Sequence, residues 1–253
     1  TEPCQLNHEI HTNVTSNVIE PCKHKSEKRF SEVSGAECDR KKIKDSENNT
    51  AGACAPFRRL HVCDRNLEQI DPDKIESTHN LLVDVCQAAK FEGQSITQDY
   101  PKYRATYVDS PSQICTMLAR SFANIGDIIR GKDLYRGNKK KNEKDREKER
   151  LQQNLRSIFA KIYGTLPEEK NSAYLKDGPN YYQLREDWWT ANRETVWKAL
   201  TCHAVQNDKY FRDACSGGKS STPNKCRCTT HDVPTYFDYV PQYLRWFEEW
   251  AED

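Results

Sequence analysis

Eleven cysteines are distributed unevenly along this chain of 253 residues. Five of them precede residue 64, and none falls between Cys115 and Cys202. Disulfides form and persist in oxidising compartments and are rare in a reducing cytosol, so this cysteine content indicates an extracellular setting. The distribution predicts a cross-linked, irregular N-terminal part, followed by a helical body that a second cysteine cluster closes. Because eleven is odd, one thiol lacks a partner in the chain.

The charge of the chain is nearly balanced overall but uneven locally. The net charge is +1, with a local +4 over 22–65, another +4 over 132–150 and −5 over 232–253. This pattern suits an anionic partner on one face, and it disfavours nucleic-acid binding, for which a whole domain is usually basic. No signal peptide opens the chain and no apolar run of about 20 residues could span a bilayer, so we expect an ectodomain piece of a larger protein without direct membrane insertion.

Helical periodicity dominates after residue 71, whereas residues 1–65 are rich in turn formers and charges. The expected helices cover 73–92 with a stop at Gly93, Ser110 to near Gly131, 138–162, the stretch after the Asp177-Gly178-Pro179 turn, and the stretch from Pro241 onward. The second helix has one apolar stripe, made of Ile114, Leu118, Phe122, Ile125 and Ile129. The last helix has an apolar set made of Tyr243, Leu244, Phe247, Trp250 and Ala251. A weak strand signal is confined to Arg104–Val108, so the body is predicted to be a helical bundle.

The helix expected over 138–162 has a charged first half. Its cations and anions alternate from Lys144 to Arg150 at helical spacing, which predicts a solvated face with internal ion pairs. Lys139, Lys140 and Lys141 differ, because they follow a predicted loop and no acid interrupts them.

Several residue groups could suggest chemistry, but their spacing argues against it. Cys202 and His203 are adjacent on a helix and so cannot form a nucleophile–base pair. The Cys226-Arg227-Cys228 segment lacks a second cysteine pair for a zinc site, and disulfides are favoured there. Neighbouring carboxylates such as Glu186-Asp187 lack the separation that a glycosidase requires. We therefore expect no catalytic residues, no metal and no cofactor.

Three tryptophans, Trp188, Trp189 and Trp197, invite an interpretation as sugar-stacking residues. Their spacing on one helix instead predicts that they pack in the core.

Five segments together carry a resemblance to a known family. They are CAPFRRLHVC (54–63), LLVDVCQAAKFEG (81–93), ARSFANIGDIIRGKDLY (119–135), EDWWTANRETVWKALTC (186–202) and PQYLRWFEEWAED (241–253). In these segments the chain resembles the Duffy-binding-like domain, specifically the alpha class of the erythrocyte membrane protein family of Plasmodium falciparum, a variant surface antigen. The resemblance covers essentially the whole chain.

The resemblance implies a mainly α-helical fold in subdomains. The expected division is 1–109 for a disulfide-tied irregular first subdomain, 110–240 for a helical-bundle second subdomain, and 241–253 for the start of a third subdomain that is otherwise missing. It also implies the nested disulfides Cys22–Cys63 and Cys38–Cys54. Further pairs expected are Cys115–Cys226 and Cys202–Cys228, with Cys215 as a competitor for both, and Cys4–Cys86, unless one of these two is free.

By the same resemblance, the chain is expected to be a non-enzymatic adhesion module on the extracellular face of the infected erythrocyte. Implied partners are host erythrocyte receptors and glycans, namely heparin-like sulfated glycosaminoglycans, blood-group sugars and a complement-receptor glycoprotein, together with host antibodies. The alternative is a structural head module that only positions neighbouring adhesive domains. The candidate glycan-binding residues are Lys139, Lys140, Lys141, Lys41, Lys42 and Lys44, with Arg58 and Arg59 as weaker candidates.

Overall fold

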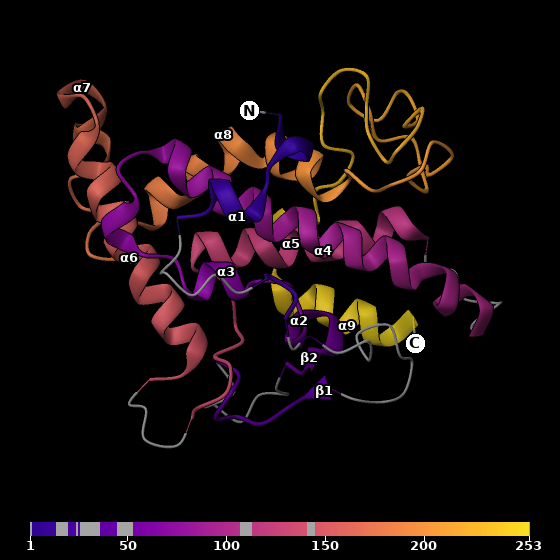
Figure 1. The fold of residues 1–253 in the computed structure, drawn as a ribbon, viewed down its shortest axis with the longest axis horizontal. Helices are drawn as coiled ribbons and strands as arrows, with labels where there is room; N and C mark the ends of the chain where they lie inside the picture. Colours follow the sequence, from indigo (N-terminus) through magenta and orange to yellow (C-terminus); the bar gives the residue numbers. More distant parts are fainter. Residues whose placement is uncertain are drawn as a thin grey trace.

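The computed structural model of the chain describes residues 2–13, 20–23, 25, 36–44, 53–106, 113–140 and 145–252. Figure 1 shows a predominantly helical molecule. The long helices are α4 (Thr78–Thr106), α5 (Ile114–Arg130), α6 (Glu147–Thr165), α8 (Tyr182–Leu200) and α9 (Gln242–Glu252). The short helices are α1 (His8–His11), α2 (Phe57–Leu60), α3 (Arg65–Glu68) and α7 (Glu168–Asn171), with 3₁₀ turns at Pro3–Gln5, Pro72–Lys74, Ser172–Tyr174 and Phe237–Tyr239. One antiparallel pair joins β1 (Ala36–Glu37) to β2 (Ala55–Pro56).

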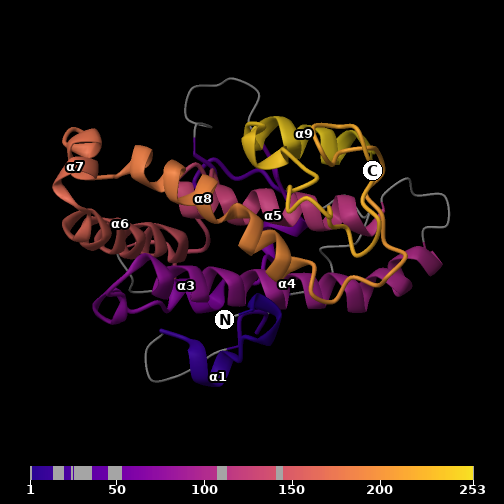
Figure 2. The same cartoon turned by 90° about the horizontal axis from the view of Figure 1, so that it is seen from above.

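Helices α4, α5 and α8 lie lengthwise against one another and form the centre of the core (Figure 2). The predicted stripe of α5 is fully or almost fully buried there, and the helix ends at Gly131 with a φ of +76°, as predicted. Phe122 of α5 contacts Trp189 and Trp197 of α8, with ring centroids 5.1 and 5.3 Å apart. All three tryptophans of α8 are at most 5% exposed, which confirms that they pack in the core. The expected start of the α5 helix at Ser110 lies outside the described residues, and the helix they show begins at Ile114 after Gln113.

Helix α4 begins at Thr78 and not at residue 73, because Pro72–Lys74 forms a separate 3₁₀ turn. It is nevertheless longer than predicted, because Gly93 does not end it. A Cβ atom placed on Gly93 would lie 1.7 Å from the backbone oxygen of Leu200, the last residue of α8. The missing side chain therefore permits close contact between two helices, and no left-handed turn forms at this glycine. The helix continues through Pro101 to Thr106, so the described part of the predicted strand Arg104–Val108 is helical.

Helix α6 is shorter than predicted, since it begins at Glu147 and not at residue 138. Arg146 is its N-cap, and the side chain of Glu149 accepts a hydrogen bond from the Arg146 backbone N–H at 2.9 Å, which satisfies an amide at the helix start. The prediction of a solvated charged face was wrong for Lys148, whereas Arg150 is exposed. Lys148 is 3% exposed, and its ammonium group lies 2.6 Å from Asp64 and also contacts Glu68.

The described side chains of the apolar set predicted for α9 are largely exposed. Tyr243, Leu244 and Phe247 are 53, 45 and 74% exposed, whereas Trp246 is 1% exposed. The buried side of α9 is held largely by polar contacts, such as the ion pair between Arg245 and Asp127 of α5. Hydrophobic periodicity alone could not reveal such a polar contact face.

Five disulfides cross-link the described residues. Cys22–Cys63, Cys38–Cys54 and Cys115–Cys226 agree with expectation. Cys38–Cys54 directly extends the β1–β2 pair, in which Glu37 faces Ala55.

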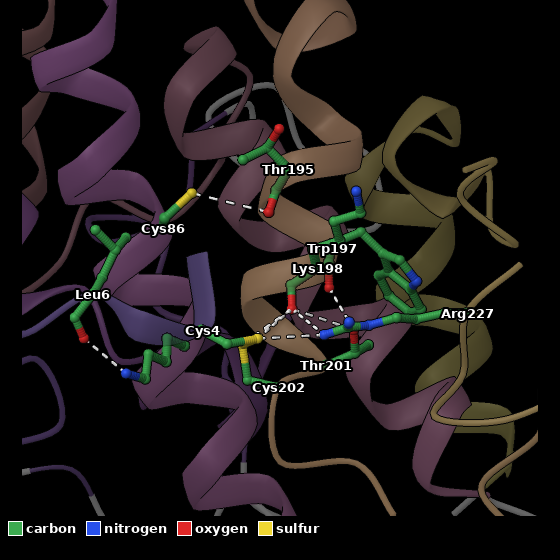
Figure 3. Close-up of a disulfide and its surroundings, with 10 residues drawn as sticks. Cys4, Leu6, Cys86, Thr195, Trp197, Lys198, Thr201, Cys202 and Arg227 are labelled. Atoms are coloured by element: carbon green, nitrogen blue, oxygen red, sulfur yellow. Dashed lines mark hydrogen bonds between the residues drawn. A yellow bond between two sulfur atoms is a disulfide. The ribbon is translucent and has the colours of Figure 1, made fainter. Parts of the chain in front are cut away.

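The two remaining pairings correct the expectation. Cys4 joins Cys202 and not Cys86, because the 3₁₀ turn Pro3–Gln5 packs against the end of α8 (Figure 3). Cys228 joins Cys215 within one compact C-terminal loop, so it is not available to Cys202. Cys86 is the free cysteine; its thiol is buried beside the Thr195 carbonyl of α8, and burial raises the pKa of this thiol to about 12.

Candidate functional site

The structure brings together the two basic runs that the sequence predicted as candidates. The Ile43 and Tyr135 backbones form an isolated antiparallel bridge. The Lys44 backbone N–H donates to the Leu134 carbonyl at 2.8 Å, and the Arg136 backbone N–H donates to the Lys42 carbonyl at 2.7 Å. The buried side chains of Ile43 and Tyr135 pack with Trp246 of α9 in a second, smaller hydrophobic cluster. The loop 39–44 is thereby fixed to the segment that leads to Lys139.

The candidate lysines differ in their freedom to meet a ligand. Lys41, Lys139 and Lys140 are exposed, and none of them forms an ion pair with a described residue. Lys42 is paired with Glu37. Lys141 lies outside the described residues.

Lys44 is half-buried and donates a hydrogen bond from its ammonium group to the Asp133 carbonyl at 2.7 Å. Burial lowers the pKa of Lys44 and outweighs the Asp133 carboxylate, which raises it, while the nearby cations Arg136 and Arg185 add to the lowering. Lys44 is therefore a cation held in place, and it is less exposed than Lys41, Lys139 and Lys140.

Arg58 and Arg59 are not available for glycan binding. They are 4% and 0% exposed. Arg58 forms an ion pair with Glu249 of α9 at 2.7 Å, and Arg59 binds Asp133 through two guanidinium nitrogens. Burial by itself disfavours the Arg59 charge, but the Asp133 carboxylate outweighs this effect and raises the pKa of Arg59. These two arginines connect α2 to the rest of the fold.

Asp64 organises a buried charge cluster, which we define as Asp64 with its three cations. The carboxylate lies 3.0 Å from Lys25, 2.6 Å from Lys148 and 3.8 Å from Arg59. Burial opposes the Asp64 charge, but Lys148, Lys25 and Arg59 outweigh it and lower the pKa of this carboxyl. The Asp64 cluster therefore links the N-terminal segment, α2 and α6, and its cations already have a partner.

A cleft of about 350 Å³ opens beside these loops, between the 131–136 segment, α6 and the start of α8. Its lining cations include Lys44, Arg156 and Arg185. Arg185 is 1% exposed, and it donates to the Ile129 carbonyl at 2.6 Å and to the Gln152 side chain at 2.7 Å.

The sequence-based candidates did not include Arg156 or Arg185. A usable signal was nevertheless present for Arg185, which lies four residues before Trp189 on the second buried side of the central helix. A charged residue on a predicted buried side needs a partner or a ligand. Arg156 offers no such signal, because a single arginine on an amphipathic helix is common.

The structure is therefore a disulfide-linked helical domain in which the loop with Lys41 is joined to the segment that leads to Lys139. The family model described as the Duffy binding domain matches residues 52–245, and the chain belongs to this family. Duffy binding domains are adhesion modules and not enzymes.

Solved structures support the assignment. The NTS-DBL1-alpha and CIDR-gamma double domain of PfEMP1 from the varO strain of Plasmodium falciparum matches with a TM-score of 0.80 and 43% identity, over 98% of this chain and 35% of that chain. The NTS-DBL1(alpha-1) domain from the same strain matches at 0.76 and 43%, over 92% of this chain and 51% of that one. A DBL-beta domain of PfEMP1 bound to human ICAM-1 matches at 0.75 and 32%, over 99% and 50%.

The chain thus spans between a third and about half of the length of these solved proteins. Comparison with curated protein sequences gave no match. Among the helices that the structure describes, none has both the length and the apolar character needed to cross a membrane.

Proposed function

We propose that this domain is a cell-adhesion module of a parasite variant surface antigen, and that it binds anionic host glycans through its joined basic loops. The observation that carries the proposal is the bridge between Ile43 and Tyr135. It places the loop with Lys41 beside the segment that leads to Lys139 and Lys140, and these three cations are exposed and unpaired among the described residues.

Exposed lysines suit a sulfated glycosaminoglycan for an electrostatic reason. A flexible ammonium group does not demand one fixed geometry, and several of them together attract a chain of sulfates over a distance. Each contact is weak, but many copies of the domain on one cell would raise the total avidity strongly.

The family supports a finer form of this proposal. The identity of 43% to DBL1-alpha domains, against 32% to a DBL-beta domain, favours the alpha class. For this class we infer display on the infected erythrocyte and participation in rosetting through heparan sulfate, blood-group sugars or a complement receptor. The DBL-beta relative bound to human ICAM-1 makes a protein receptor a second form of the same adhesive role.

The alternative is a head module that positions neighbouring adhesive domains without a ligand of its own. Glutamate at Lys139, Lys140 and Lys141 separates the two functions. We expect this triple variant to elute from a heparin column at clearly lower salt with an unchanged melting temperature, because it removes the cations that are proposed to attract the sulfates. Binding by the wild type should fall as the salt concentration rises, since screening at physiological salt limits the reach of such charges to about 8 Å.

The matched control replaces three exposed lysines elsewhere, Lys170, Lys209 and Lys219, with glutamate. This control makes the same change in net charge, so it separates a local effect from a general charge effect. If binding is local, the control should elute near the wild type. Equal loss in both variants would show that only the net charge matters. Unchanged elution of the first variant would remove this loop from the site and direct attention to Lys41 and Lys42.

A further inference from the structure

The cleft between the 131–136 segment, α6 and α8 holds three cations whose hydrogen-bond partners are neutral. Among the described residues, none of Lys44, Arg156 and Arg185 forms an ion pair. Their hydrogen-bond partners are neutral: the Asp133 carbonyl for Lys44, the Asn180 side-chain amide for Arg156, and backbone carbonyls with the Gln152 amide for Arg185.

The acidic residues that line the cleft have partners of their own. The Asp133 carboxylate binds Arg59 and the Gln242 side chain, and it also attracts Lys44 electrostatically. Glu149 accepts the Arg146 amide at the start of α6, and Asp145 accepts a hydrogen bond from Gln153 at 3.3 Å. Asp145 and Glu149 have neutral partners and so keep their negative charge. With Arg136 and Lys148, however, five cations and three acids line the cleft, so its lining carries an excess of two positive charges.

Arg185 is the most informative of the three, because it is almost completely buried. Its Nε and Nη2 atoms donate to the last carbonyls of α5, at Ile129 and Ile128. Its Nη1 atom points to Gly131, where a Cβ atom placed on the glycine would lie only 2.8 Å away, and Gly131 also lines the cleft. One guanidinium edge thus completes the helix end, while Nη1 is directed toward the cleft.

Capping of α5 accounts for part of this arrangement. The carbonyl end of a helix carries about half a negative charge, which is less than the full charge of one guanidinium. Burial lowers the pKa of Arg185 to about 10, and the neighbouring Arg156 contributes to that shift. A neutral side chain could fill the space of Arg185 and would avoid the repulsion between Arg185 and Arg156. The presence of three cations in the cleft therefore needs a reason beyond capping of α5.

We propose that this cleft binds one sulfate ester group of a host glycan between Lys44, Arg156 and Arg185. A tetrahedral oxyanion would complete the charge balance and accept charge-assisted hydrogen bonds from two guanidinium groups. This inference rests on the proposed glycan-binding function and gives it a defined anchor, with Lys139 and Lys140 following the cleft residue Arg136 in sequence.

Tyr182 extends the proposal from the sulfate to the sugar. It lines the same cleft, and its side chain is 53% exposed. An aromatic ring with a polar tip offers an apolar face to a sugar ring at the mouth of the anion site. Replacement of Tyr182 with alanine should therefore weaken binding of a heparin oligosaccharide while leaving the binding of inorganic sulfate unchanged.

The first test measures inorganic sulfate by isothermal titration calorimetry at constant ionic strength, using the whole domain. We expect saturable binding by the wild type and a loss of about a hundredfold in the double variant Lys44→Gln/Arg156→Gln, because each charge-assisted hydrogen bond contributes about tenfold. Arg185 is left intact, since its removal would expose the end of α5. The double variant Lys139→Gln/Lys140→Gln removes the same charge and should bind sulfate as the wild type does.

A second measurement uses a heparin oligosaccharide and its chemically desulfated form, which keeps the carboxylates. Both double variants should weaken binding of the sulfated form, and the desulfated form should not respond to the cleft variant. A cleft-dependent affinity for the desulfated form would assign the pocket to a carboxylate and overturn the sulfate proposal.

The two proposals can fail separately. Sulfate binding that is lost in the cleft variant, with no effect of any variant on heparin, would support the anion cleft and overturn the glycan function. Heparin binding that depends on Lys139 and Lys140, with sulfate binding equal in wild type and cleft variant, would support the function and overturn the cleft.

Discussion

Two groups of inward-facing cations in this domain have opposite surroundings. In the Asp64 cluster, Lys25, Lys148 and Arg59 converge on one buried carboxylate, and further acids such as Glu68 and Asp133 are adjacent. In the cleft, Lys44, Arg156 and Arg185 have neutral hydrogen-bond partners and form no ion pair with a described residue.

The difference separates structural charges from charges that are suited to a ligand. A cation that is buried with its carboxylate is already satisfied, and removal of either partner leaves an uncompensated charge. A cation that is held by carbonyls and amides keeps most of its charge available. Position in the sequence does not distinguish the two groups, because Lys148 and Arg156 lie on the same helix, eight residues apart.

Replacement of Asp64 with asparagine should have the largest effect on stability. Three buried cations would lose their common carboxylate, so we expect the free energy of unfolding to fall by about 3–5 kcal/mol. Urea denaturation followed by circular dichroism measures this change. Asp73→Asn is the matched control, because Asp73 makes a solvent-exposed ion pair with Lys161, and it should change stability by less than about 1 kcal/mol. Similar losses in both variants would contradict a special role for Asp64.

The pH dependence of stability should sharpen the same contrast. The folded-state pKa of Asp64 lies below its unfolded value, so its contribution is fully present above the unfolded value of about 3.9 and is lost as the pH falls toward the folded pKa. We therefore expect the stability difference between wild type and Asp64→Asn to be constant near neutral pH and to shrink below about pH 4. Denaturation curves for both proteins across an acid series provide the measurement. A difference that stays constant down to about pH 2 would show that Asp64 does not titrate in this way.

The sequence predicted the helical body well where one apolar stripe faces one core. The stripe of α5, its end at Gly131 and the burial of the three tryptophans are all confirmed. The nested pair Cys22–Cys63 and Cys38–Cys54, which the family resemblance implied, is also present.

The errors arise where a polar residue or a glycine serves a contact between distant segments. Gly93 was predicted to end a helix, but it permits the approach of Leu200, which lies 107 residues further along the chain. Arg58 and Arg59 were candidates for a surface site, but their acids lie at Glu249 and Asp133. The pairings of Cys4 and Cys228 likewise depend on how the N-terminal turn and the C-terminal loop dock, which local pattern does not encode.

The smallest predicted effect concerns the cleft and has the opposite sign to that of Asp64→Asn. Arg156 is half-buried near Arg185, and its hydrogen bond to Asn180 is long, at 3.4 Å. Arg156→Gln should therefore relieve repulsion and raise the free energy of unfolding by about 0.5 kcal/mol, as expected where function is maintained at some cost in stability. The measurement is urea denaturation in chloride buffer without sulfate. Arg156→Lys keeps the charge, so it should give no such gain. A loss of stability in Arg156→Gln would place this cation with those of the Asp64 cluster, as part of the structural framework.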